Sequence, residues 1–341
     1  TPSRATTPVV PWPNRAARMS ITSVSRQGSA VRAVVMLKMK AGCSRATPAL
    51  IPRVPGAMLP LKDNIPTVRF PIVTIVLIAI NLAVFAWQTS LSNEPDSSTS
   101  PHVQGLSEYD ERTLELGAIP YRLTHPGKQC GVVVGTRESL QRVTDPVVCD
   151  GTAAKREAEA TPRIAVVDLE GPAAWLTVIT SMFMHGGLLH IAGNMLFLWV
   201  FGNNVEDAMG RLRFVLFYLL AGAVAVYAQA LLDTASTTPT IGASGAVAGV
   251  LGGYILLHPR ARVVSLVFII FFVTLIEIPA LILLGIWFAL QFLPAVGQVA
   301  TQDLGGEGIA YLAHVGGFAF GLAAIKLFTM GRRDQPAMRS A

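Results

Sequence analysis

Long apolar segments separated by polar ones dominate the pattern of this chain. Uncharged stretches of about 20 residues, the length that crosses the hydrocarbon core of a bilayer, recur from residue 70 to residue 328. We expect membrane-spanning helices near 70–88, 187–202, 214–232, 243–258, 277–296 and 308–328, with 173–186 lying at the membrane interface. This arrangement predicts an all-α polytopic membrane protein with six transmembrane helices.

The stretch 263–297 leaves two interpretations open. It is apolar apart from Glu277, so it could contain two helices, or one helix after an interfacial segment at 263–276. Ser244 and His314 each stand near the N-terminal end of their own apolar stretch. They meet at one depth only if their helices run in the same direction, which requires an odd number of spans between them. One helix near 277–296 is therefore favoured.

Positive charges support the same topology independently. Cytoplasmic loops of membrane proteins are enriched in Lys and Arg, and the short loops 233–242 and 297–307 contain neither residue. A cytoplasmic N-terminus places these basic residues inside: Lys62, Arg69, Arg211, Arg213, Arg260, Arg262, Arg332 and Arg333. We therefore expect a multi-pass protein of the cell (plasma) membrane, with Ser244 and His314 toward the extracytoplasmic side.

Composition agrees with a membrane protein and defines the flanking segments. Hydrophobic residues make up 52% of the chain and charged residues 14%, against about 25% charged residues in soluble domains. Residues 1–57 contain nine Lys or Arg and no acidic residue, without the interleaved aromatics of a nucleic-acid surface. We expect 1–57 to be a disordered extension, Met58 to be a more natural beginning, 58–330 to be the membrane domain and 331–341 to be a short cytoplasmic tail.

The segment 90–172 is hydrophilic and forms a large loop between the first two spans. It contains thirteen acidic and eight basic residues, together with Cys130 and Cys149. Three cysteines in the whole chain are too few for a disulfide framework or a zinc site of paired CxxC motifs. A Cys130–Cys149 bridge is plausible if the loop faces an oxidising compartment.

Ser244 and His314 are the candidate reactive side chains. Ser and His are the two halves of an activated nucleophile, and a polar group within a membrane span is costly without a partner. Small residues recur at four-residue spacing in both segments, including Gly245, Gly317 and Gly321. Such residues let two helices approach closely, so we expect a seam that brings His314 to Ser244.

A second pair of polar residues, His190 and Asn194, lies four positions apart on one helical face. Two donors on one face suit a developing oxyanion, and the Ser244 backbone N–H could be a third. Paired histidines can also bind metal, but no HExxH-type motif or nearby carboxylate supports that use. We expect neither a metal nor a cofactor.

These motifs together resemble the rhomboid family of intramembrane serine proteases over about residues 58–330. The resemblance rests on GASGA around Ser244, AHVGGF around His314 and HGGLLHIAGN ending at Asn194. It implies a six-transmembrane-helix rhomboid-like bundle, in which Ser244 is the nucleophile and His314 the general base of a dyad. It also implies an oxyanion hole of His190, Asn194 and the Ser244 amide, with Gly242 shaping the preceding turn and Glu206 in a structural role.

Two positions depart from the pattern of that family. Many members have an aromatic residue one turn after the nucleophile, where this chain has Ala248, so we expect Phe318 or Tyr311 to fix the His314 side chain instead. Many members also have a Trp-Arg pair in the first loop, where this chain has Trp175 without an Arg.

The function expected is hydrolysis of a peptide bond in a single-pass membrane protein, near the outer boundary of the lipid bilayer. One alternative is a catalytically silent relative that binds membrane clients for quality control, but such relatives typically lose the Ser or the His. A transporter would show an internal inverted repeat or polar residues lining several helices, and neither is present. No nucleic-acid partner is expected, and the oligomeric state is not indicated.

Overall fold

A computed structural model describes residues 58–91, 107–135, 145–162, 164–269, 272–301 and 309–331. They all belong to one compact unit, Val54–Ala341. The expected disordered extension, 1–57, and all but the first residue of the expected tail lie outside the described residues. The described part is mostly helical, as expected, and also contains two three-stranded sheets that the all-α prediction did not include.

Five helical segments in the described residues are long and apolar enough to cross a membrane. They are α1 (Ile72–Ser90), α7 with η2 and α8 (Leu188–Phe197, Leu198–Gly202 and Asn203–Met209), α9 (Arg211–Leu232), α11 (Ala280–Thr301) and α12 (Tyr311–Thr329). The sixth expected span, α10 (Ser244–Leu257), has 14 residues. At about 1.5 Å per residue it extends about 21 Å, less than the roughly 30 Å of a hydrocarbon core.

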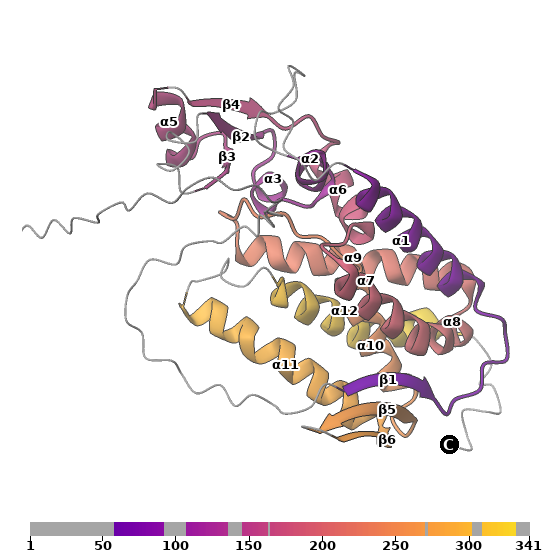
Figure 1. The fold of residues 1–341 in the computed structure, drawn as a ribbon. Helices are drawn as coiled ribbons and strands as arrows, with labels where there is room; N and C mark the ends of the chain where they lie inside the picture. Colours follow the sequence, from indigo (N-terminus) through magenta and orange to yellow (C-terminus); the bar gives the residue numbers. More distant parts are fainter. Residues whose placement is uncertain are drawn as a thin grey trace, which may run out of the picture. The chain divides into compact units, whose positions relative to one another are not determined.

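Helix α10 lies at the centre of the bundle, and its residues Gly245 to Ile255 are all buried (Figure 1). Glycines make this possible, because α10 touches α9 and α12 almost backbone to backbone. A Cβ atom on Gly321 of α12 would overlap the carbonyl oxygen of Gly249, and one on Gly317 would overlap that of Gly245. The seam expected between these two helices is therefore confirmed.

The segment before α11 is a β-hairpin, so the interfacial segment expected at 263–276 is replaced by strands. Strands β5 (Arg262–Ile269) and β6 (Phe272–Pro279) pair with each other, and β1 (Met58–Asp63) adds to β5, in the order β1-β5-β6. Burial alternates along β5, because Val263, Ser265 and Val267 are buried while Val264 and Leu266 between them are only partly buried. The expectation of a single helix between α10 and α12 is confirmed by α11.

Asp63, at the end of β1, joins this sheet to the bundle. Its carboxylate accepts hydrogen bonds from Asn204 Nδ2 and from the Tyr254 hydroxyl, both at 2.5 Å. Burial raises the pKa of the Asp63 carboxyl, and the two hydrogen bonds act in the opposite direction. The sheet is thus fixed to α8 and α10 through one buried side chain.

Glu206 joins α8 to the start of α1. Its carboxylate accepts hydrogen bonds from the backbone N–H groups of Val73 and Thr74, at 3.0 and 2.8 Å, and from the Thr74 hydroxyl at 2.8 Å. The first N–H groups of a helix have no partner within it, and a carboxylate also interacts favourably with the helix dipole there. Glu206 therefore caps a membrane helix from a neighbouring one.

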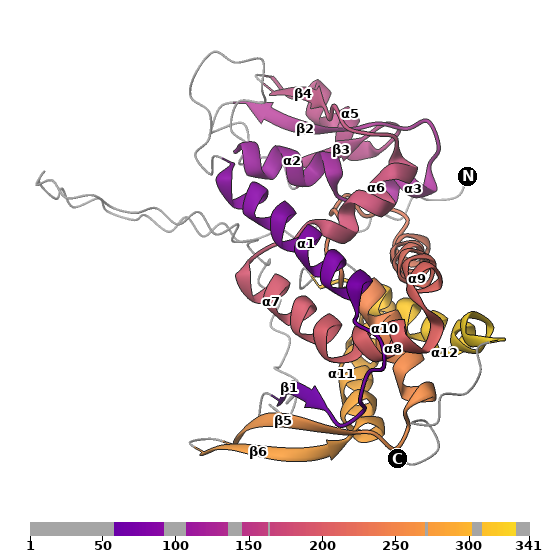
Figure 2. The same cartoon turned by 90° about the vertical axis from the view of Figure 1, so that its right-hand side faces the viewer.

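The hydrophilic segment between α1 and α6 forms a small folded unit, which we call the insert (the described residues within 107–168). It contains α2 (Glu108–Leu116), α3 (Pro120–Thr124), α5 (Ala153–Ala160), β2 (Cys130–Gly135), β3 (Val147–Cys149) and β4 (Ile164–Asp168). The strands are antiparallel in the order β3-β2-β4. Figures 1 and 2 show the insert and the β1-β5-β6 sheet at opposite ends of α1.

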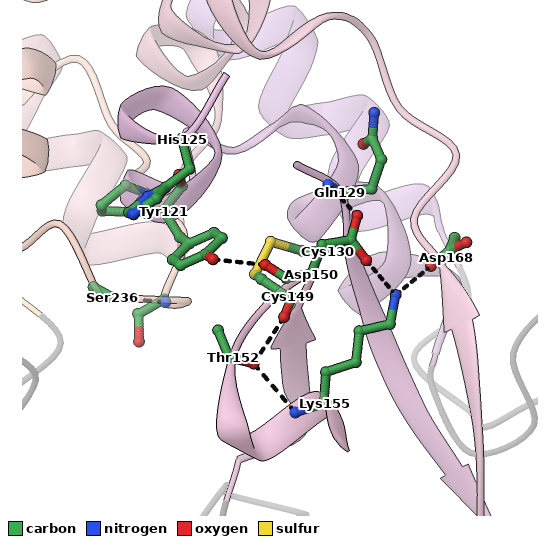
Figure 3. The surroundings of a disulfide bond; sticks show 12 residues. Tyr121, His125, Gln129, Cys130, Cys149, Asp150, Thr152, Lys155, Asp168 and Ser236 are labelled. Atoms are coloured by element: carbon green, nitrogen blue, oxygen red, sulfur yellow. Dashed lines mark hydrogen bonds and ion pairs between the residues drawn. A yellow bond between two sulfur atoms is a disulfide. The ribbon is translucent and has the colours of Figure 1, made fainter. Parts of the chain in front are cut away.

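A disulfide joins Cys130 of β2 to Cys149 of β3, so the bridge considered from the sequence is present (Figure 3). Polar contacts surround it. The Tyr121 hydroxyl donates to the Asp150 carbonyl at 2.6 Å, and Lys155 Nζ donates to Asp150 Oδ1 at 2.7 Å. After the insert, α6 (Ala174–Thr180) and the 3-10 turn η1 (Ser181–Phe183) lead to α7.

Candidate active site

Ser244 and His314 lie in direct hydrogen-bond contact. Ser244 is the first residue of α10, and His314 is in the first turn of α12. The distance from Ser244 Oγ to His314 Nε2 is 2.7 Å, and both side chains are partly buried. Close backbone packing at Gly245 and Gly317 brings the two helix starts together.

Gly242 has the backbone conformation that the preceding turn requires. Its φ of +121° lies in a region that residues with side chains rarely adopt. A Cβ atom there would also lie 2.7 Å from His190 Nε2 and 3.6 Å from Ser244 Oγ. The chain thus passes close to two site residues at a point where only glycine fits.

Two parts of the protein hold the loop that leads to Ser244. From the bundle side, Gly242 N–H donates to the Ser181 carbonyl at 2.8 Å. From the insert, Ala118 and Thr240 exchange backbone hydrogen bonds of 2.9 and 3.1 Å, and Tyr121 N–H donates to the Ser236 carbonyl at 3.0 Å. The segment expected to be a hydrophilic loop therefore contacts the approach to the candidate nucleophile.

His190 and Asn194 are on α7 and line the same cavity as Ser244 and His314. Asn194 Nδ2 donates to the His190 carbonyl at 3.0 Å, within its own helix. As the first residue of α10, Ser244 also has a backbone N–H among those that the helix itself leaves unused. The expected donors thus gather around one cavity, with the Asn194 amide engaged with its own helix.

His185, which lies near these cavity residues, supports the loop that leads to Ser244. It is fully buried, and its Nε2 accepts from Ala243 N–H at 3.5 Å. Gln88 of α1 holds the His185 backbone, accepting from its N–H at 2.9 Å and donating to its carbonyl at 3.4 Å.

Sequence reasoning missed Gln291 of α11. Its Oε1 lies 2.8 Å from His314 Nδ1, on the far side of the ring from Ser244. The Trp287 ring is 6.1 Å from the His314 ring, centre to centre. Gln291 and Trp287 therefore place α11 beside His314, and the expectation that Phe318 or Tyr311 fixes its side chain stays a prediction. The signal was available, because Gln291 is an amide in the middle of an apolar span, and such residues are expensive without a partner.

The cavity has a volume of about 690 Å³ and is lined by five polar residues of the site together with small residues that include Gly222, Ala225 and Ala246; the polar ones are Ser244, His314, His190, Asn194 and Gln291. No group of three or more His, Cys, Asp or Glu residues in the described part of the chain could hold a metal ion. The arrangement can transfer a proton from a serine hydroxyl to an imidazole, next to N–H donors that can stabilise an oxyanion.

Part of the chain is similar to known proteins. The Rhomboid domain model matches residues 172–331. Rhomboid protein 1, mitochondrial, of Saccharomyces cerevisiae is 32% identical over 152 residues, 43% of this chain and 40% of that protein. Rhomboid protease GluP of Bacillus subtilis is 40% identical over 88 residues, 25% of this chain and 17% of that protein.

The human presenilin-associated rhomboid-like protein, mitochondrial, is 29% identical over 147 residues, 42% of this chain and 36% of that protein. The chain thus matches less than half the length of each of these relatives. The matched domain contains α6 to α12 with the candidate site, whereas the insert and α1 precede it. Through this domain, the chain is a multi-pass membrane protein that belongs to the rhomboid family.

Proposed function

We propose that this protein is an intramembrane serine endopeptidase that cleaves single-pass transmembrane proteins with a Ser244–His314 dyad. The observation that carries the proposal is the 2.7 Å contact between Ser244 Oγ and His314 Nε2 in a cavity among membrane helices. A serine is a weak nucleophile unless a base removes its proton, and an adjacent imidazole is a common base for this purpose.

In the first half of the reaction, Ser244 Oγ attacks the scissile carbonyl carbon while its proton moves to His314 Nε2. The tetrahedral intermediate then breaks its C–N bond, and the protonated His314 gives that proton to the leaving amine. An acyl-enzyme ester on Ser244 remains. In the second half, His314 takes a proton from water, hydroxide attacks the ester, and the proton returns to Ser244 Oγ.

His190, Asn194 and the Ser244 backbone N–H are proposed to stabilise the oxyanion. They line the cavity beside Ser244, and preorganised donors of this kind are worth several kcal/mol in a water-poor site. Asn194 Nδ2 carries two hydrogens, so it can keep the 3.0 Å hydrogen bond to the His190 carbonyl and donate its second hydrogen to the oxyanion. A substrate oxyanion, being charged, is the stronger acceptor.

The proposed substrate is a transmembrane helix that unwinds locally near the membrane boundary. An intact helix uses its carbonyls in hydrogen bonds four residues apart, so a scissile carbonyl must first be released. Gly222, Ala225 and Ala246 line part of the cavity, which suits a small substrate side chain next to the cleaved bond.

We propose that the active site faces the extracytoplasmic side of the cell membrane and that the N-terminal side of α1 is cytoplasmic. The insert contains the Cys130–Cys149 disulfide and pairs with the loop before Ser244 through Ala118 and Thr240, and disulfides persist in oxidising compartments. Because two of the relatives have mitochondrial names, a mitochondrial membrane is the alternative destination. Fractionation, with protease protection of the insert, decides between the two.

The test is labelling with a fluorophosphonate probe in mild detergent and in liposomes, alongside cleavage of a single-pass membrane substrate. We expect labelling and cleavage of the wild type, and neither in Ser244→Ala or His314→Ala. Ser90→Ala, which changes an exposed serine at the end of α1, is the matched control and retains both. A folded wild type that neither labels nor cleaves in liposomes would overturn the proposal and favour a client-binding role.

A further inference from the structure

We propose that Gln291 is a positioning residue for the general base, so that catalysis depends on where α11 lies. This inference rests on the proposed function, because it assigns His314 the role of base. It adds a third member to the dyad, and that member comes from a helix other than the two that contain Ser244 and His314.

The geometry assigns the proton on the imidazole. Gln291 Oε1 is an acceptor and lies 2.8 Å from His314 Nδ1, so Nδ1 carries the hydrogen. A neutral imidazole then has its free electron pair on Nε2, which faces Ser244 Oγ at 2.7 Å. The contact with Gln291 thus selects the tautomer that can accept the serine proton.

The same contact fixes the orientation of the ring. Hydrogen bonds on both nitrogens hold the imidazole between α10 and α11, and the Trp287 ring lies beside it at 6.1 Å. Ala248 provides no aromatic face one turn after Ser244. Residues of α11 therefore supply the orientation that side chains of α10 do not.

Helix α11 is less enclosed than α10, so packing constrains its position relative to His314 less tightly. The side chains of Leu290, Phe292 and Leu293 are 44% to 67% exposed, whereas α10 is buried along most of its length. Stacking of Phe288 on Phe318, with centres 4.5 Å apart, joins α11 to α12. A shift of α11 by a few ångströms breaks a 2.8 Å hydrogen bond, so α11 must be in place for the base to be correctly oriented.

Two variants of Gln291 test this role through steady-state kinetics with a transmembrane substrate. Gln291→Leu nearly keeps the volume and removes the acceptor, and we expect kcat to fall about 10- to 100-fold, which is less than most of the roughly 10²–10⁴-fold that a general base contributes, because His314 itself remains. KM should stay within about threefold, because uniform binding is not removed. Gln291→Glu restores an acceptor and should recover most of kcat.

The matched control is Gln298→Leu, the same change two turns further along α11. The Gln298 side-chain oxygen has no hydrogen-bond partner among the described residues, so this variant should keep the wild-type kcat. A loss of kcat in Gln298→Leu equal to that in Gln291→Leu would overturn the proposal, because it would show a general effect on α11. Retention of kcat by Gln291→Leu would overturn it as well.

A spectroscopic measurement tests the contact without activity. ¹⁵N NMR of histidine-labelled protein, with His314→Ala to assign the signal, should show the Nδ1–H tautomer in the wild type and in Gln291→Glu. Gln291→Leu should show a mixture, and a pure Nδ1–H signal in that variant would contradict the proposal. If the wild type does not cleave, the proposed function fails, while the tautomer still decides whether Gln291 orients His314.

Discussion

The helix bundle and the insert become compact by different means. In the bundle, α9, α10 and α12 pack through glycine and alanine, with Gly249 of α10 facing Ala221 of α9 and Gly321 of α12. In the insert, a disulfide joins two short strands, and Asp150 accepts from Lys155 and from the Gln129 N–H.

The difference follows from the solvent that each region meets. Lipid tails are as apolar as the side chains, so membrane helices gain little from burying apolar surface and depend on close contact. A small unit in water cannot bury enough apolar surface alone, and a disulfide compensates by restricting the unfolded chain. We therefore expect substitutions that add volume to be most destabilising in the bundle. Substitutions that remove a cross-link should be most destabilising in the insert.

The largest effect is expected from Gly321→Val in the α10–α12 seam. Its side chain would overlap the carbonyl oxygen of Gly249, which belongs to the backbone and cannot rotate away. We expect no folded protein to be recovered in detergent. Gly285→Ala on α11, where a Cβ atom meets nothing within 4 Å, is the matched control and should gain up to about 1 kcal/mol from helix propensity. Equal thermal melting of both variants would contradict this account of the seam.

The next effect is expected from replacing Cys130 and Cys149 together by serine. A cross-link over a separation of 19 residues is worth about 3 kcal/mol to the part that it closes. We expect limited proteolysis to cut the variant within the insert, while the bundle keeps its thermal transition. A parallel loss of the bundle transition would show that the two regions fold as one unit.

A smaller effect is expected from Glu206→Gln. The amide keeps one acceptor oxygen but loses the charge that three donors of Val73 and Thr74 share. Hydrogen bonds to charged groups contribute about 1.5–3 kcal/mol each, against about 1 for neutral ones, so we expect a loss of about 1–2 kcal/mol. Thermal melting measures it, and Asp207→Asn, the neighbouring carboxylate, provides a comparison.

The smallest effect concerns pH and is confined to the insert. The hydrogen bond from Lys155 lowers the pKa of Asp150. A carboxylate with a lowered folded-state pKa contributes stability above its unfolded value of about 3.9, and this contribution is lost as the pH falls through the folded value. The resistance of the insert to an acid-active protease should decline below about pH 4. Asp150→Asn should abolish that dependence, and an unchanged decline would exclude Asp150 as its source.

Features fixed by local sequence could be predicted, and features fixed by distant pairing could not. The spans depend on runs of apolar residues, and the seam depends on the spacing of Gly245, Gly317 and Gly321. The pairing of β1 with β5 joins segments about 200 residues apart, and no local pattern in 263–276 distinguishes a strand in a sheet from an interfacial segment. The fold of the insert depends in the same way on β2 meeting both β3 and β4.

The candidate site likewise combines residues that a local motif predicts with one that depends on distant packing. Ser244, His314, His190 and Asn194 stand in recognisable motifs, and the structure gathers them around one cavity. Gln291 has no motif, because its role depends on the rotation of α11 relative to His314. Only the cost of an amide in an apolar span pointed to it.

The short length of α10 has a consequence for the membranes in which this protein can work. A transmembrane helix that touches lipid adjusts its tilt when the bilayer is thicker or thinner. Helix α10 is enclosed by its neighbours over nearly its whole length, so the surrounding helices absorb any mismatch and the position of Ser244 is set by packing. We therefore expect Ser244 to keep the same position within the helix bundle in bilayers of different thickness.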